Sequence, residues 1–180
     1  MRSHTSIPAW LVAAALAVCL VQPSSAADSA KEFRARFAEQ VQVEETGLPA
    51  YPGATPHRET GDEGNGLSAA LSLGQLGFKL VVAKFRTLGQ PEQVASFYRE
   101  ALSRWGTVLD CNDPKNRRPL PAKDRDQVLQ CDSSAPKAGQ QVFKVGTPQE
   151  QRIVIVQAQG QGGEFRVVQV SGKGAQVNIN

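Results

Sequence analysis

Residues 91–105 read Pro-Glu-Gln-Val-Ala-Ser-Phe-Tyr-Arg-Glu-Ala-Leu-Ser-Arg-Trp, the most regular pattern in this chain of 180 residues. Apolar side chains recur there at intervals of three and four, which places them on one face of an α-helix. They are Val94, Phe97, Tyr98, Ala101, Leu102 and Trp105. Pro91 suits a first helical turn, and Gly106 is typical of a helix end. We expect a helix over 91–105 that packs this stripe against a sheet.

Segments on both sides of this helix predict the sheet. Before the helix, residues 67–73 and 78–85 read as two strands, joined by Gly74-Gln-Leu-Gly77 in a hairpin. After it come three more strand candidates, separated by short breaks that suit antiparallel neighbours. These span residues 141–145, 152–157 and 164–170. Residues 153–156 are apolar on both faces, so their strand should be central.

Residues 27–45 have the spacing of a second helix. Ser29 can cap its first turn, with a glutamate three residues later as in a capping box. Apolar residues then recur every four positions. They are Phe33, Phe37 and Val41. A further valine at position 43 alternates with the last of them, so the end of the segment could instead be extended. We expect an N-terminal helix here.

The start of the chain has the layout of a secretory signal peptide. Arg2 precedes an apolar run over 10–21, which is followed by small residues up to Ala26 and Ala27. That run of about 12 residues is shorter than the roughly 20 that cross a bilayer. We expect cleavage near Ala26 or Ala27 and a periplasmic or secreted protein. Lipidation at Cys19 is an alternative, but the preceding residue is larger than such sites usually carry.

The expected mature chain of about 153 residues is long enough for one domain with its own core. We expect residues 1–26 to be removed, an N-terminal helix in 27–45, one domain over 46–171, and a flexible tail over 172–180. The expected fold is α+β. It consists of an antiparallel sheet of about five or six strands, with the helix over 91–105 packed on one face.

Two cysteines, Cys111 and Cys131, remain after the leader is removed. In an oxidising compartment this even pair predicts one disulfide. The bond would close a loop of about 20 residues, worth ~3 kcal/mol in the chain-entropy model. A redox-active pair is the alternative, although catalytic dithiols usually stand two residues apart. Two cysteines and one histidine are too few for an ordinary structural zinc site, so we expect no metal and no cofactor.

Charge is spread along the chain. Because Arg2 leaves with the leader, 19 of the 20 lysines and arginines remain beside 17 acidic residues. No block of like charge suggests a nucleic-acid arm or a polybasic membrane patch. The densest basic stretch covers residues 115–118, with Lys123 and Arg125 beyond it, among prolines. We interpret it as a solvated loop, with anion binding as the alternative, and expect no nucleic-acid partner and no transmembrane segment.

Several short motifs are similar to those of a family of small exported bacterial proteins of unknown function. The motifs are Leu48-Pro-Ala-Tyr-Pro-Gly-Ala54, Lys84-Phe-Arg-Thr87, the helical residues 91–102, Lys144-Val-Gly-Thr147 and Gly163-Glu-Phe165. The resemblance covers residues 46–171, the whole of the expected domain. The motifs form structure rather than chemistry, so the resemblance implies a fold and no catalytic residues.

The small inventory of reactive groups favours binding over catalysis. His57 is the single histidine outside the leader, and no Gly-x-Ser-x-Gly elbow occurs. We expect an exported, non-catalytic domain that binds a protein, a cell-envelope component or a small apolar ligand. The alternative is a periplasmic hydrolase whose carboxylates converge only in the fold. A ligand would lie on the sheet face away from the helix. That face should carry Leu80, Val82, Val154 and Val156.

Overall fold

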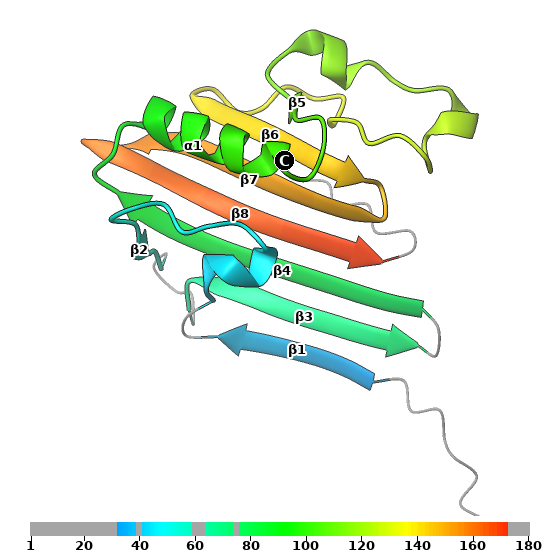
Figure 1. The fold of residues 1–180 in the computed structure, drawn as a ribbon, viewed down its shortest axis with the longest axis horizontal. Helices are drawn as coiled ribbons and strands as arrows, with labels where there is room; N and C mark the ends of the chain where they lie inside the picture. Colours follow the sequence, from blue (N-terminus) through cyan, green and yellow to red (C-terminus); the bar gives the residue numbers. More distant parts are fainter. Residues whose placement is uncertain (1–31, 39–40, 59–63, 74–75, 173–180) are drawn as a thin grey trace, which may run out of the picture.

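A computed structural model describes residues 32–38, 41–58, 64–73 and 76–172 as one antiparallel sheet with a helix on one face (Figure 1). The long strands are β3 (Gly66–Leu73), β4 (Leu76–Thr87), β6 (Gln140–Thr147), β7 (Glu150–Gln159) and β8 (Gly162–Gly172). The shorter ones are β1 (Glu32–Ala38), β2 (Thr55–Pro56) and β5 (Leu109–Asp110). Within the described residues the order is β1-β3-β4-β8-β7-β6-β5, and β2 pairs with β4. The predicted α+β class with an antiparallel sheet is therefore confirmed.

The sheet has more strands than the five or six predicted. Seven lie along the path given above, and β2 makes the eighth in the described part of the chain. Two of the additional strands, β2 and β5, are only two residues long, which is too short to show a period-two pattern. The third, β1, replaces a predicted helix.

Residues 32–38 form β1, so the N-terminal helix predicted over 27–45 is wrong at these positions. In β1, Phe33 pairs with Leu71 and Phe37 with Leu67, both in β3. A spacing of four residues fits one face of a helix, but it also fits one face of a strand, because four is a multiple of two. The short 3-10 helix η1 (Val43–Thr46) follows. Residues 27–31 and 39–40 of the predicted helix, the leader with its cleavage sites and the tail after 172 lie outside the described residues.

The helix α1 (Pro91–Ser103) lies across strands β6, β7 and β8 (Figure 1). Its buried side chains form the main core with the facing side of the sheet. Tyr98 and Leu102 of the helix are fully buried there, as are Phe143 and Phe165 of the sheet. Several rings contact one another; for example, the centroids of Tyr98 and Phe165 are 5.2 Å apart. The predicted helix and its packing on the sheet are thus confirmed.

Trp105 departs from the predicted stripe. The helix ends at Ser103, and Trp105 lies in the turn beyond it with 43% of its surface exposed. Its ring lies over the guanidinium of Arg152, 3.2 Å from ring centroid to Cζ. Helical spacing places residue 105 on the apolar face only if the helix continues that far. Its early end moves the ring to the edge of the core.

The opposite face of the sheet carries a second apolar cluster, covered in part by the segment that follows β5. Cys111 and Cys131 pack there with residues of β6, β7 and β8. The sheet residues are Val142, Ile153, Ile155, Val168 and Val170, with Leu80 and Val82 half-buried beside them. Val154 and Val156 belong instead to the helix side, which corrects the prediction for this strand. Their faces follow from register, because Val154 pairs with Val167, which pairs with Ala83 in the helix-side core.

Candidate functional site

The segment between β5 and β6, residues 111–139, forms a loop that its disulfide closes and that hydrogen bonds of Cys111 and Asn112 hold to β6. The sulfurs of Cys111 and Cys131 are bonded at 1.96 Å, and the backbone N–H of Cys131 donates to the Asn116 carbonyl at 3.2 Å. Asn112 fixes the loop to β6. Its side-chain oxygen accepts from the Val142 N–H at 3.0 Å, and its amide donates to the Gln140 carbonyl at 2.7 Å. The loop is therefore an ordered layer over the sheet.

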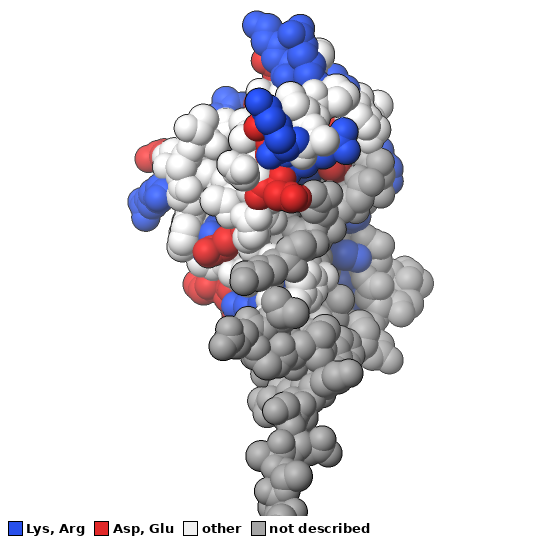
Figure 2. All heavy atoms as spheres, turned by 90° about the vertical axis from the view of Figure 1, so that its right-hand side faces the viewer, with Lys and Arg blue, Asp and Glu red and all other residues white. Residues whose placement is uncertain are grey.

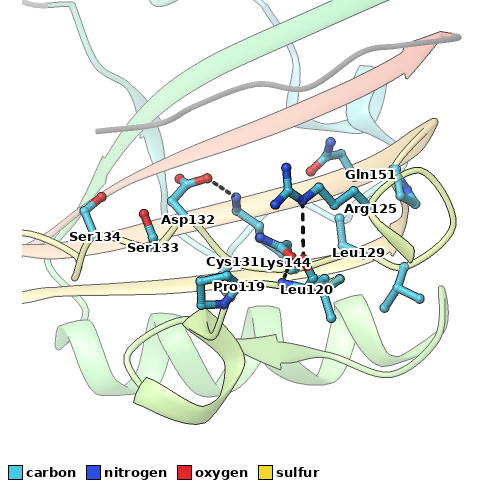
Figure 3. A pocket seen from close by; sticks show the side chains of 13 residues that line it. Pro119, Leu120, Arg125, Leu129, Cys131, Asp132, Ser133, Ser134, Lys144 and Gln151 are labelled. Atoms are coloured by element: carbon cyan, nitrogen blue, oxygen red, sulfur yellow. Dashed lines mark hydrogen bonds and ion pairs between the residues drawn. The ribbon is translucent and has the colours of Figure 1, made fainter. Parts of the chain in front are cut away.

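A pocket of about 400 Å³ lies between this loop and the strands beneath it (Figure 3). The loop contributes an apolar side and a polar side. The apolar lining consists of Pro119, Leu120, Val128 and Leu129, and the polar lining includes Arg125, Asp132, Ser133 and Ser134. Lys144 of β6 and Gln151 of β7 line the floor, and Cys131 joins it to the loop. This volume lies in the range that small-molecule pockets occupy.

Lys144 is the distinctive group of this pocket. Its side chain is only 4% exposed, and its Nζ lies 3.2 Å from Oδ1 of Asp132, which is 26% exposed (Figure 3). An ammonium taken out of water needs a partner, because desolvation disfavours an isolated charge. Asp132, which follows the disulfide directly, supplies that partner. The loop thus holds a buried cation in place at the floor of the pocket.

The charges that line the pocket are unequal among the described residues. Among the described lining residues, two cations, Arg125 and Lys144, face one carboxylate, that of Asp132. The Arg125 Nε donates to the carbonyl of Leu120 at 3.3 Å, which positions its guanidinium along the loop. An anionic group would complement this excess of positive charge. Apolar side chains such as Leu129 would contact the rest of such a ligand.

Most of the basic residues predicted from the sequence lie away from the pocket. Figure 2 shows lysine and arginine side chains gathered at the top of the molecule, the end where Figure 1 places the loop. Of the basic stretch over 115–118 with Lys123 and Arg125, only Arg125 lines the pocket. Sequence reasoning missed Lys144. The available signal was a lysine flanked by Val142, Phe143 and Val145, in the apolar middle of a predicted strand.

His57, the predicted lone histidine, lies at a separate polar recess beside β2. It is 8% exposed, and its Nε2 lies 3.5 Å from Oε2 of Glu164, which is 4% exposed. The Glu164 carboxylate also accepts from Gln157 Nε2 at 3.3 Å and from Arg166 Nη2 at 3.4 Å. In the described residues this recess contains one carboxylate, and the chain forms no cluster of three or more histidine, cysteine and acidic side chains able to hold a metal.

Comparison with family models, with curated proteins and with solved structures finds no match to this chain. The resemblance to a family of small exported bacterial proteins therefore stays a prediction. Among the helices that the structure describes, none is long and apolar enough to cross a membrane.

Proposed function

We propose that this protein is an exported, non-catalytic binding domain whose pocket under the disulfide loop takes a small ligand with an apolar body and an anionic group. The observation that carries the proposal is the buried ammonium of Lys144 at the floor of a pocket with leucine and valine walls. A preformed pocket with a few fixed polar groups is typical of small-molecule recognition. The Asp132 carboxylate pairs with the Lys144 ammonium, and Arg125 adds a second positive charge to the pocket.

Export is part of this proposal and has independent support. The layout of residues 1–27 is that of a signal peptide, and a disulfide between Cys111 and Cys131 suits an oxidising compartment. The disulfide also bears on binding, because it fixes the loop that carries Asp132 and Arg125. A pocket wall held in this way loses little conformational entropy when a ligand binds.

The alternative, a hydrolase that uses converging carboxylates, has weaker support. General acid and base catalysis by carboxylates needs two of them close together in one recess. The described residues bring one carboxylate, Asp132, to the loop pocket and one, Glu164, to the recess beside His57. Asp132 is engaged by the buried Lys144 ammonium. A binding role uses both features as they stand.

The proposal is tested by titrating the purified protein with hexanoate and, in parallel, with 1-hexanol. We expect hexanoate to bind with a dissociation constant of about 1 mM or tighter, as suits a ligand with so few atoms. Chemical-shift changes should map to the loop and β6, and hexanol should bind more weakly. Lys144→Met should remove the preference for hexanoate. Lys123→Met, the same change at an exposed loop position, should preserve it. Equal binding of both probes to the unchanged protein would contradict the proposal.

A further inference from the structure

The recess beside His57 has a chemistry of its own, separate from the loop pocket. It is an open hollow of about 470 Å³ at the end of the sheet where β4 and β8 meet β2. Register places Arg86 of β4 directly opposite Glu164 of β8, and the next pair on the same face, two positions along, is Lys84 and Arg166. The full lining is His57, Arg58, Arg86, Gln157, Gln159, Glu164 and Arg166. Three guanidiniums therefore converge on one hollow.

A hydrogen-bonded row of side chains forms the base of this recess. Gln140 Nε2 donates to Gln157 Oε1 at 2.9 Å, and Gln157 Nε2 donates to Glu164 Oε1 at 3.3 Å. The other oxygen of Glu164 faces His57 Nε2 at 3.5 Å. This row crosses β6, β7 and β8, and its central carboxylate is almost fully buried. Arg86 and Arg166 lie on β4 and β8, so a rigid sheet rather than a loop holds these two guanidiniums beside the row.

The positive charge of the recess is only partly balanced within the described residues. Among the residues that the structure describes, Glu164 is the one carboxylate that lines it, beside three arginines. Arg166 contacts that carboxylate at 3.4 Å, whereas Arg86 is exposed and no described residue pairs with its guanidinium. Like charges held together favour a bound anion. A guanidinium presents paired N–H donors that match the oxygens of a phosphate.

We propose that this recess binds a phosphate group, either as a free phosphate or as the headgroup of a phospholipid. Arg86 is the main residue that contacts the phosphate. Arg166 and Arg58 add positive charge, and the Glu164 carboxylate contacts Arg166. The volume exceeds what a phosphate ion alone fills, which leaves space for the molecule that carries the group. The position beside the exposed Leu88, 89% of whose surface is accessible, suits a headgroup at a lipid surface as well as a free phosphate.

The test uses two probes and matched variants of the full mature chain. Inorganic phosphate is titrated at low ionic strength, and vesicles of phosphatidylglycerol are compared with vesicles of phosphatidylcholine by flotation. We expect Arg86→Gln to weaken binding of the probe by about tenfold or more, since a charge-assisted contact is lost. Arg118→Gln, the same charge change on the exposed loop, should leave binding unchanged. Binding of free phosphate identifies the soluble source, and binding only to phosphatidylglycerol vesicles identifies the headgroup.

Three results would overturn this inference. The first is no binding of either probe by the unchanged protein. The second is an equal effect of Arg86→Gln and Arg118→Gln, which would show that only net charge matters. The third is loss of phosphate binding in Lys144→Met, which would assign the anion to the loop pocket instead. Because the hexanoate test responds to Lys144 and this test to Arg86, failure of one proposal is distinguishable from failure of the other.

Discussion

Replacement of Trp105 by alanine should lower the free energy of unfolding by about half as much as replacement of a fully buried tryptophan does. Complete loss of a core tryptophan ring typically costs ~3–5 kcal/mol. Trp105 is 43% exposed, so we expect a loss of about 2 kcal/mol in the free energy of unfolding. For a domain of this size that loss corresponds to a melting temperature lower by ~6 °C. Part of the loss comes from the contact between the ring and the Arg152 guanidinium, at 3.2 Å.

That contact joins three parts of the fold. Arg152 is 5% exposed in β7, and its Nε donates to the carbonyl of Thr46 in η1 at 2.8 Å. Burial lowers the pKa of Arg152, and Glu150 opposes this only in part. The ring also closes over the end of η1. A Cβ at Gly47, whose φ is 78°, would lie 3.1 Å from the indole. Trp105 therefore covers a buried cation that fixes η1 to the sheet.

A double-mutant cycle with Trp105→Ala and Arg152→Met measures this coupling. The stability of each variant is determined by unfolding in urea, monitored by far-UV circular dichroism. We expect a coupling energy of about 1 kcal/mol between the two side chains. Leu88→Ala is the control, because Leu88 is 89% exposed and its loss should change stability by less than about 0.5 kcal/mol. A cost of about 4 kcal/mol or more for Trp105→Ala, twice the expected value, would show that the ring is fully buried and would refute this reasoning. Additive single effects would refute the ring–guanidinium contact.

Three further outcomes are expected. Reduction of the bond between Cys111 and Cys131 should lower the free energy of unfolding by ~3 kcal/mol, and the double serine variant should show no response to reductant in thermal melts. Asp132→Asn should lower the free energy of unfolding by about 3–5 kcal/mol, because it leaves the Lys144 ammonium buried without a counter-ion. Lys144→Met should lower it less, because the Asp132 carboxylate that remains is 26% exposed. Chemical denaturation measures both values. Burial raises the pKa of Tyr98, and the nearby Tyr51 backbone offsets this only in part. The unfolded chain ionises this tyrosine above pH ~10 while the folded chain does not, so stability should fall by about 1.4 kcal/mol per pH unit there, and pH-dependent denaturation of Tyr98→Phe should lack this component.

The sequence predicts the parts of the fold whose pattern has one interpretation. The stripe in α1 has helical spacing only, and the runs that form β6, β7 and β8 are rich in β-branched residues and separated by short breaks. The pattern fails at β1, where apolar residues four apart fit a helix and a strand equally. It also fails at β2 and β5, which are too short to show alternation. Pairing with a neighbouring strand, which is not local information, decides these segments.

The candidate sites were less accessible to sequence reasoning, because each combines strand residues with residues from a separate loop segment. Lys144 and Asp132 are separated by a turn, and only the fold of the disulfide loop brings them to 3.2 Å. His57 and Glu164 are more than a hundred positions apart, and they meet because β2 and β8 flank opposite sides of β4. Register determines which residues share a face, and a shift of one position reverses it, as the prediction for β7 illustrates.

Native mass spectrometry of the protein, purified from the cells that make it, tests the proposed binding role most directly. The account predicts a disulfide-bonded polypeptide that retains an added small mass after desalting. In protein that carries Lys144→Met this mass should be lost, and in protein that carries Lys123→Met it should be retained. A bare polypeptide in every sample, or an added mass that is unaffected by Lys144→Met, would contradict a ligand site at the buried lysine.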